Sequence, residues 1–311
     1  MAAPCICEPS NRYSAAIQSA AQSLEWGKSP RYGGLLVRRW DCPAHVLQLT
    51  ASIALFMIEL KNVQKSYDGG ATLAVADTSL TIERGEFLGL IGASGCGKTT
   101  TLKMINRLEE SSSGEILVNG RNVIDQNPEQ LRRNIGYVFQ GIGLFPHRTV
   151  AENVAAVPQL LQWSADDIRV RCEECLEMVG LPFDEYGDRS PSQLSGGQQQ
   201  RIGVARALAT RPEVVLMDEP FGALDPITRS ELQEEFKSIQ QNMALTVVMV
   251  THDMTEALLL ADRIAVMREG VVLQIGTPKE LLNNPSHDYV RDIVAMPRRR
   301  AQRLEELMRN G

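Results

Sequence analysis

The stretch Glu86-Phe87-Leu88-Gly89-Leu90-Ile91-Gly92-Ala93-Ser94-Gly95-Cys96-Gly97-Lys98-Thr99 joins an apolar segment to a glycine-rich one. An apolar strand runs into a loop that matches the pattern GxxxxGK[ST], and a helix is expected from Lys98 to about residue 107. Glycines let the backbone wrap so closely that successive N–H groups point at one phosphate, and the helix N-terminus adds partial positive charge. The stretch therefore predicts a phosphate loop between a strand and a helix.

The phosphate loop, residues 92–99, predicts binding of a nucleoside triphosphate, ATP. Lys98 would place a point charge on the β- and γ-phosphates, and the hydroxyl of Thr99 would be a ligand of Mg²⁺. The alternative, a structural glycine-rich turn, does not account for the strand before the loop and the helix after it. The residues of this segment that we expect at the nucleotide are Gly92, Ser94, Gly95, Cys96, Gly97, Lys98, Thr99 and Thr100.

A carboxylate pair closes the apolar strand at residues 214–217. Asp218 is expected to reach Mg²⁺, and Glu219 is expected to orient and deprotonate the attacking water. The alternative is a surface Asp-Glu pair. That alternative explains neither the apolar run before the pair nor Pro220 after it.

Two more polar residues follow predicted strands. His252 comes after the apolar run at residues 246–250, and open α/β sheets bind their ligands where strands end. Gln140 follows the strand at residues 135–139, and its amide could contact Mg²⁺ or the attacking water. Both residues are therefore candidates for the catalytic site. Tyr67, an aromatic residue ahead of the phosphate loop, is a weaker candidate for stacking on adenine.

A second glycine pair lies in Leu194-Ser195-Gly196-Gly197-Gln198-Gln199-Gln200-Arg201, ahead of a helix expected to reach about Thr210. Helix N-termini bind phosphate, but this one has no lysine. A chain with a complete phosphate loop does not need it for its own nucleotide. The segment therefore indicates a protein that acts as a pair.

The order of elements predicts an α/β protein. Apolar runs on both faces at residues 214–217 and 246–250 are typical of central strands in a parallel sheet, and strands alternate with helices. Residues 57 to about 91 are β-rich, with strands expected at 57–63, 79–82 and 86–91, and another at 114–118. Residues 150–210 are mostly helical. We expect an ATPase domain at 57–295, a helical subdomain at about 145–210 and a basic tail at 296–311, after a helix from about Pro285.

Residues 1–56 carry a net charge of +2 and little periodicity. We interpret them as a disordered leader or as the product of an upstream start, since Met57 could be the initiator. Arg38-Arg39 before an apolar run resembles an export signal, a less favoured alternative.

Composition excludes several classes of protein. The net charge of −6 argues against a nucleic-acid-binding protein, and no run reaches the about 18 to 20 apolar residues that span a membrane. Cys172 and Cys175 form a CxxC, but they share a helical face with other apolar residues. We therefore expect them to be small buried hydrophobic residues in a reducing, cytosolic chain rather than half of a metal site.

The chain resembles the ATP-binding cassette ATPases over residues 57 to about 295. The matching positions are Tyr67 for the adenine-stacking aromatic, 92–99 for Walker A, Gln140 for the Q-loop, 194–198 for the signature, 214–219 for Walker B, Asp225 for the D-loop and His252 for the switch histidine. The resemblance implies a P-loop NTPase with a RecA-like parallel sheet, an antiparallel β subdomain and a helical subdomain that carries the signature. It also implies a head-to-tail dimer.

In such a dimer, the signature of one subunit binds the γ-phosphate held by the other. The signature residues to which this role carries over are Ser195, Gly196, Gly197 and Gln198. Thr99, Gln140 and Asp218 are the expected Mg²⁺ ligands.

Further matches, at residues 103–108, 143–147 and 157–160, resemble the ATPase subunits of osmoprotectant importers of the glycine betaine, choline and carnitine type. That resemblance implies a peripheral subunit on the cytoplasmic face of the cell membrane, two permease subunits and, indirectly, a substrate-binding protein, with no nucleic acid. The alternatives are an importer ATPase for an amino acid or another polar solute, a soluble cassette protein acting on ribosomes or DNA, and a small-molecule P-loop kinase.

Overall fold

The computed structural model describes residues 56–70, 72–141 and 143–310. The interpretations of residues 1–55, including the Arg38-Arg39 pair, lie outside the described residues.

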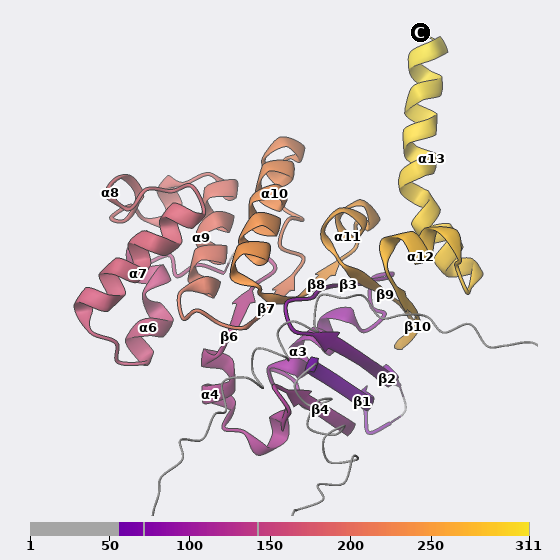
Figure 1. Cartoon of the computed structure of the whole chain (residues 1–311), viewed down its shortest axis with the longest axis horizontal. Helices are drawn as coiled ribbons and strands as arrows, with labels where there is room; N and C mark the ends of the chain where they lie inside the picture. The colour runs from indigo at the N-terminus through magenta and orange to yellow at the C-terminus, as the bar shows by residue number, and fades with distance from the viewer. Residues whose placement is uncertain (1–55, 71, 142, 311) are drawn as a thin grey trace, which may run out of the picture. The chain divides into compact units, whose positions relative to one another are not determined.

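The described strands form two sheets (Figure 1). The first is antiparallel, in the order β2-β1-β4-β5. The second has the order β10-β9-β3-β8-β7-β6 and is parallel except for β10 at its edge. The strands are β1 (Phe56–Ser66), β2 (Leu73–Glu83), β3 (Phe87–Ile91), β4 (Ser113–Val118), β5 (Arg121–Asn122), β6 (Ile135–Val138), β7 (Val214–Asp218), β8 (Thr246–Thr251), β9 (Arg263–Arg268) and β10 (Val271–Gly276).

Helices follow most strands of the parallel sheet, and α5 to α9 succeed one another without a strand between them. The α-helices are α3 (Lys98–Ile105), α4 (Pro128–Arg133), α5 (Val150–Val154), α6 (Ala156–Leu160), α7 (Ala165–Met178), α8 (Phe183–Tyr186), α9 (Gly196–Leu208), α10 (Pro226–Met243), α11 (Met254–Leu260), α12 (Pro278–Asn283) and α13 (Asp288–Asn310). Short 3₁₀ turns lie at Val123–Asp125 and Pro191–Gln193.

The central strands of the parallel sheet separate two hydrophobic cores. Side chains alternate between the faces of a strand, so Phe87 and Ile91 enter the core formed with α5, α7, α9 and α10. Leu88 and Leu90 enter the other core, which the antiparallel sheet and α3 complete. All residues of β3, β7 and β8 are buried. For β7 and β8 this confirms the prediction of central strands from the apolar runs at 214–217 and 246–250.

The α/β fold with an antiparallel β part and a helical insertion is confirmed. Each predicted strand from residue 57 to 250 lies within or overlaps an observed one, and the helix after the phosphate loop begins at Lys98 as expected. The helix expected from about Pro285 begins at Asp288, and the imidazole Nδ1 of His287 accepts a hydrogen bond from the N–H of Tyr289 (3.0 Å). Pro297 does not end it, so the basic segment at 298–300 is helical.

Cys172 and Cys175 lie buried on α7, as the helical face predicted. Burial raises the pKa of the Cys172 thiol to about 11 and that of Cys175 to about 12. Both thiols are therefore protonated at neutral pH, which fits small hydrophobic residues rather than nucleophiles.

A buried arginine on α7 donates hydrogen bonds to the backbone carbonyls at the end of α9. Arg171 is 4% exposed, and its guanidinium donates to the carbonyl oxygens of Leu208 (2.7 Å) and Ala209 (3.0 Å). The last carbonyls of a helix have no partner within the helix, so this side chain supplies one. Arg169, two residues earlier, makes an exposed ion pair with Glu173 instead.

We predict that Arg171→Met destabilises the protein by about 2 kcal/mol, because two buried carbonyls lose charged donors. The matched variant Arg169→Met should change stability by less than about 1 kcal/mol, because exposed ion pairs contribute little. Urea unfolding of both variants measures this difference. Equal losses in the two variants would show that the buried contacts of Arg171 do not stabilise α9.

Candidate functional site

The candidate site lies where four parallel strands end. The register pairs Ile91 with Thr251 across β3 and β8, Asp218 with Val250 across β7 and β8, and Val138 with Met217 across β6 and β7. The segments that follow these strands carry the phosphate loop, Glu219, His252 and Gln140. The site therefore occupies the edge at which open α/β sheets bind ligands.

The phosphate loop needs its glycines for conformation and for close approach. Gly92, Gly95 and Gly97 have φ angles of 156°, 79° and 101°. A Cβ on Gly92 would lie 2.1 Å from the carbonyl oxygen of Met267, and one on Gly97 would lie 2.4 Å from that of Ala74. The loop is thus pressed against neighbouring strands, and only glycine fits at these two positions.

Lys98 is folded under the loop. Its ammonium donates to the carbonyl oxygens of Gly92 (2.8 Å) and Ala93 (3.0 Å), and the residue is 6% exposed. The Cys96 thiol, 5% exposed, lies 3.8 Å from the same ammonium. The positive charge that would bind a phosphate is therefore held at the loop by hydrogen bonds from Lys98 to the loop backbone.

Thr99 and Asp218 are brought together as the sequence predicted. The Thr99 hydroxyl donates to Oδ1 of Asp218 at 2.9 Å. Burial raises the pKa of the Asp218 carboxyl, and the hydrogen bond from Thr99 opposes this rise. A buried carboxylate beside a hydroxyl is a hard oxygen donor set, and it fits Mg²⁺.

Glu219 lies at the centre of the polar cluster. Its Oε2 accepts a hydrogen bond from Nε2 of Gln140 (3.1 Å) and lies 3.3 Å from Nδ1 of His252. Its backbone has a φ of 46°, which is unusual for a residue with a side chain, and its N–H donates to the carbonyl of Val250 (2.9 Å). The left-handed backbone turns the carboxylate out of β7 toward Gln140 and His252. Gln140 thus contacts Glu219 rather than the pair formed by Thr99 and Asp218.

The second glycine pair begins α9. Ser195 and Gln198 form a capping box, in which Gln198 N donates to Ser195 Oγ (3.2 Å) and Ser195 N donates to Gln198 Oε1 (2.9 Å). Ser195 and Gly196 are exposed, whereas Gly197 is buried. Among the described residues, no hydrogen bond joins this helix end to the phosphate loop, so this chain does not close the two into one site.

Gly197 has a packing role that the sequence did not reveal. A Cβ on it would lie 2.4 Å from Cγ2 of Thr228 on α10, whereas one on Gly196 would meet nothing within 4 Å. Asp225 begins α10 and accepts hydrogen bonds from the N–H groups of Ile227 (3.2 Å) and Thr228 (3.1 Å). Hydrogen bonds from the Thr228 side chain and then its backbone lower the pKa of Asp225, so it is ionised at this helix end.

Tyr67 follows β1 and is 62% exposed, with the ammonium of Lys65 4.8 Å from its ring centroid. An exposed ring is free to stack on a planar ligand. A second tyrosine, Tyr289, was not predicted for the site. Its hydroxyl accepts a hydrogen bond from the N–H of Ala93 in the phosphate loop at 3.0 Å. No local pattern marks Tyr289, since the two residues lie 196 positions apart.

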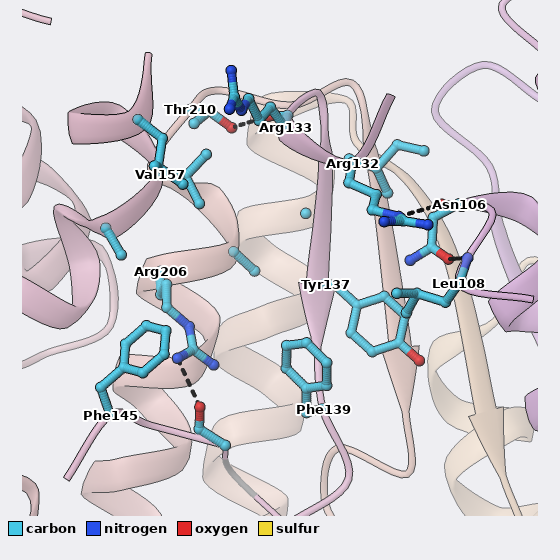
Figure 2. A pocket seen from close by; sticks show the side chains of 16 residues that line it. Asn106, Leu108, Arg132, Arg133, Tyr137, Phe139, Phe145, Val157, Arg206 and Thr210 are labelled. Carbon is cyan, nitrogen blue, oxygen red and sulfur yellow. Dashed lines mark hydrogen bonds between the residues drawn. The ribbon is translucent and has the colours of Figure 1, made fainter. Parts of the chain in front are cut away.

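An apolar groove adjoins the site (Figure 2). Its cavity of about 350 Å³ is lined by residues that include Phe139, Phe145, Leu160 and Arg206. Phe139 and Phe145 are 43% and 41% exposed, and their ring centroids lie 5.8 Å and 5.7 Å from the Arg206 guanidinium, which donates to the carbonyl of Gly143. The groove therefore presents aromatic surface one residue away from Gln140.

No helix in the described ranges combines the length and the apolar character that crossing a membrane requires.

The fold and the site define a P-loop nucleotide-binding protein. The family model described as ABC transporter matches residues 75–222. The chain is 54% identical over 242 residues to the choline transport ATP-binding protein OpuBA of Bacillus subtilis (strain 168), covering 78% of this chain and 63% of that protein. It is 52% identical over 235 residues to the glycine betaine uptake system ATP-binding protein YehX of Escherichia coli (strain K12), covering 76% and 75%.

A solved structure gives the same result. The dimeric post-hydrolysis state of the ATP-binding cassette MJ0796, bound to ADP and Pi, matches with a TM-score of 0.64 and 36% identity, covering 71% of this chain and 99% of that one. The chain belongs to the ABC transporter family, and specifically to its ATP-binding cassette proteins. It spans only about 60 to 64% of the length of the first several relatives that it matches.

We predict that Gly197→Ala lowers stability by about 1 to 3 kcal/mol, because the added methyl group would force α9 away from α10. Gly196→Ala, its matched control, places the same group in open space and should be neutral or slightly stabilising. The midpoints of thermal unfolding compare the two. If Gly197→Ala unfolds at the same temperature as Gly196→Ala, close packing of the two helices does not require this glycine.

Proposed function

We propose that this chain is the ATP-hydrolysing subunit of a solute importer. The observation that carries the proposal is the position of Glu219, whose Oε2 faces Gln140 and His252 at the strand edge shared with Lys98 and Asp218. Hydrolysis requires a base for water next to a γ-phosphate, and this edge offers both a base and phosphate-binding groups.

In this mechanism ATP lies along the phosphate loop with its adenine on Tyr67. Lys98 exchanges its hydrogen bonds to the loop carbonyls for the β- and γ-phosphate oxygens. Glu219 accepts a proton from water as the water oxygen bonds to the γ-phosphorus, and the bond from that phosphorus to the ADP oxygen breaks. Gln140 and His252 orient Glu219 and the water.

Thr99 and Asp218 are the residues that would hold Mg²⁺, with Gln140 as a further ligand when it leaves Glu219. When bound, the ion would neutralise negative charge on the β- and γ-phosphate oxygens. Burial raises the pKa of the Asp218 carboxyl because it disfavours the ionised form, and a bound cation would stabilise that form.

We expect Glu219→Gln to lower the ATP hydrolysis rate by about 10²- to 10⁴-fold while ATP binding remains, because the amide cannot accept the proton. Lys98→Ala should instead lose affinity for ATP, because it removes the charge for the phosphates. Phosphate release and equilibrium ATP binding measure the two effects. Hydrolysis at the wild-type rate in Glu219→Gln would refute the assignment of the base.

We further propose that two copies act head to tail. Ser195, Gly196, Gly197 and Gln198 of one copy would bind the γ-phosphate on the other copy's phosphate loop, with Asp225 close to the shared surface. The exposed, capped end of α9 supports this, as does the dimer of the related cassette bound to ADP and Pi.

Ser195→Arg should abolish hydrolysis and leave ADP binding within about twofold, because it blocks only the surface presented to the partner copy. Asp184→Arg, which adds the same side chain at an exposed position of α8, is the control and should hydrolyse ATP normally. The hydrolysis rate and the ADP dissociation constant decide the outcome. Normal hydrolysis in Ser195→Arg would exclude the action of the signature on a second copy.

The proposed membrane partners are two permease subunits, each placing an apolar helical segment in the groove of Figure 2. The exposed rings of Phe139 and Phe145 suit such a segment, and Phe139 precedes Gln140 directly. Displacement of the groove would therefore move Gln140 relative to Glu219. This arrangement puts the chain at the cytoplasmic face of the membrane as a peripheral subunit, served indirectly by a substrate-binding protein.

We propose a quaternary-amine osmoprotectant as the transported solute, on the basis of the choline and glycine betaine systems to which relatives belong. In this scheme the ATP-binding subunit does not bind the solute. Uptake of labelled choline, glycine betaine and amino acids by the complete transporter distinguishes this solute class from another small polar compound.

A further inference from the structure

One contact of the phosphate loop has no place in the mechanism above. The N–H of Ala93 donates to the hydroxyl oxygen of Tyr289, at the first turn of α13, at 3.0 Å. The carbonyl of the same residue, Ala93, accepts from Lys98 at 3.0 Å. Ala93 is therefore held at one end by the C-terminal helix and at the other by the lysine that is proposed to bind phosphate.

The position of Tyr289 is fixed by the packing of α13 and by contacts of its backbone and ring. Val290 and Val294 of α13 are buried in the core at 0% and 4% exposure, and Tyr289 N donates to Nδ1 of His287 (3.0 Å). The guanidinium of Arg268, at the end of β9, lies 5.2 Å from the centroid of the Tyr289 ring. These contacts restrict the position of the Tyr289 ring.

The hydrogen bond between Ala93 and Tyr289 lies beside a cavity at the phosphate loop, where it could affect a bound nucleotide. A cavity of about 410 Å³ is lined by Ala93, Ser94, Gly95, Cys96, Arg268, Glu269 and Tyr289, so Tyr289 and the phosphate loop line one cavity. When Lys98 turns to the phosphates, the carbonyl of Ala93 keeps the hydrogen bond from the N–H of Cys96 (3.3 Å), which lies within the same loop. The hydrogen bond to Tyr289 then remains as the contact that ties Ala93 to a residue outside the loop.

We propose that Tyr289 is a positioning residue of the nucleotide site, which fixes the phosphate loop through the N–H of Ala93 and thereby links the position of α13 to nucleotide affinity. The inference rests on the proposed function, because it assumes that the loop binds a nucleotide. Tyr289 touches neither the nucleotide nor the reacting atoms in this scheme.

Tyr289→Phe tests the proposal, because it removes the hydroxyl and keeps the ring over Arg268. The ADP dissociation constant, measured by calorimetry, should rise about two- to tenfold, as expected for one lost hydrogen bond. The kcat at saturating ATP should stay within about twofold. Arg291→Gln is the matched control, since it removes an exposed ion pair with Asp288 on the same helical turn, and it should leave the ADP dissociation constant unchanged.

Amide hydrogen exchange gives a second measurement, which does not depend on nucleotide binding. The Ala93 amide should be protected in the wild-type protein, and its exchange should accelerate in Tyr289→Phe. An unchanged ADP dissociation constant in folded Tyr289→Phe, or an Ala93 amide that exchanges as fast as an unfolded peptide, would overturn the proposal. The proposed function itself fails if the wild-type protein does not bind ADP, or if the Lys98→Ala variant binds ADP as tightly as the wild-type protein does.

Discussion

Strand β8 pairs in parallel with β3 on one side and with β7 on the other. The register places Thr251 beside Ile91 and Val250 beside Asp218, so three segments that are far apart in the chain end at one edge. All three strands are buried on both faces, and a slip by one residue would exchange the side chains of the two cores. The hydrophobic pattern thereby sets the positions of the polar residues that follow each strand.

Polar groups at this edge are held by partners that a ligand can replace. Lys98 bonds to carbonyls of its own loop, Thr99 to Asp218, and Gln140 to Glu219. The first two bonds satisfy Lys98 and Asp218, which are buried and would be costly to leave unpaired. The left-handed backbone of Glu219 stores strain at the same place, and its hydrogen bond to Val250 offsets part of that strain. The site is therefore organised in advance, with several contacts that are exchangeable.

The sequence predicted the central strands because a short run that is apolar on both faces must be covered on both faces, and the middle of a parallel sheet provides that cover. It also identified Gln140, Glu219 and His252 as candidates for the catalytic site, since each follows a predicted strand. It did not predict that Gln140 bonds to Glu219 rather than joining Thr99 and Asp218, because a side chain of this length can reach either group.

Other features could not be read locally. The close approach of Gly197 to Thr228 depends on how two helices cross, and the contact between Tyr289 and Ala93 joins opposite ends of the domain. The sequence predicted a basic tail at 296–311 after a helix, but α13 continues through Pro297 to Asn310. Local propensity gave no information on these contacts, because tertiary packing decides them.

The fit of Gly197 against Thr228 has a mechanical consequence. Thr228 lies in the turn that Asp225 caps, so the segment before α9 and the segment before α10 share one rigid support. Neither can be displaced alone without opening a helix crossing that has no room for a methyl group. In the proposed head-to-tail pair, a movement that withdraws Ser195 from the partner copy's nucleotide would also displace Asp225, and a change at one nucleotide would thus be transmitted to the surface shared by both copies.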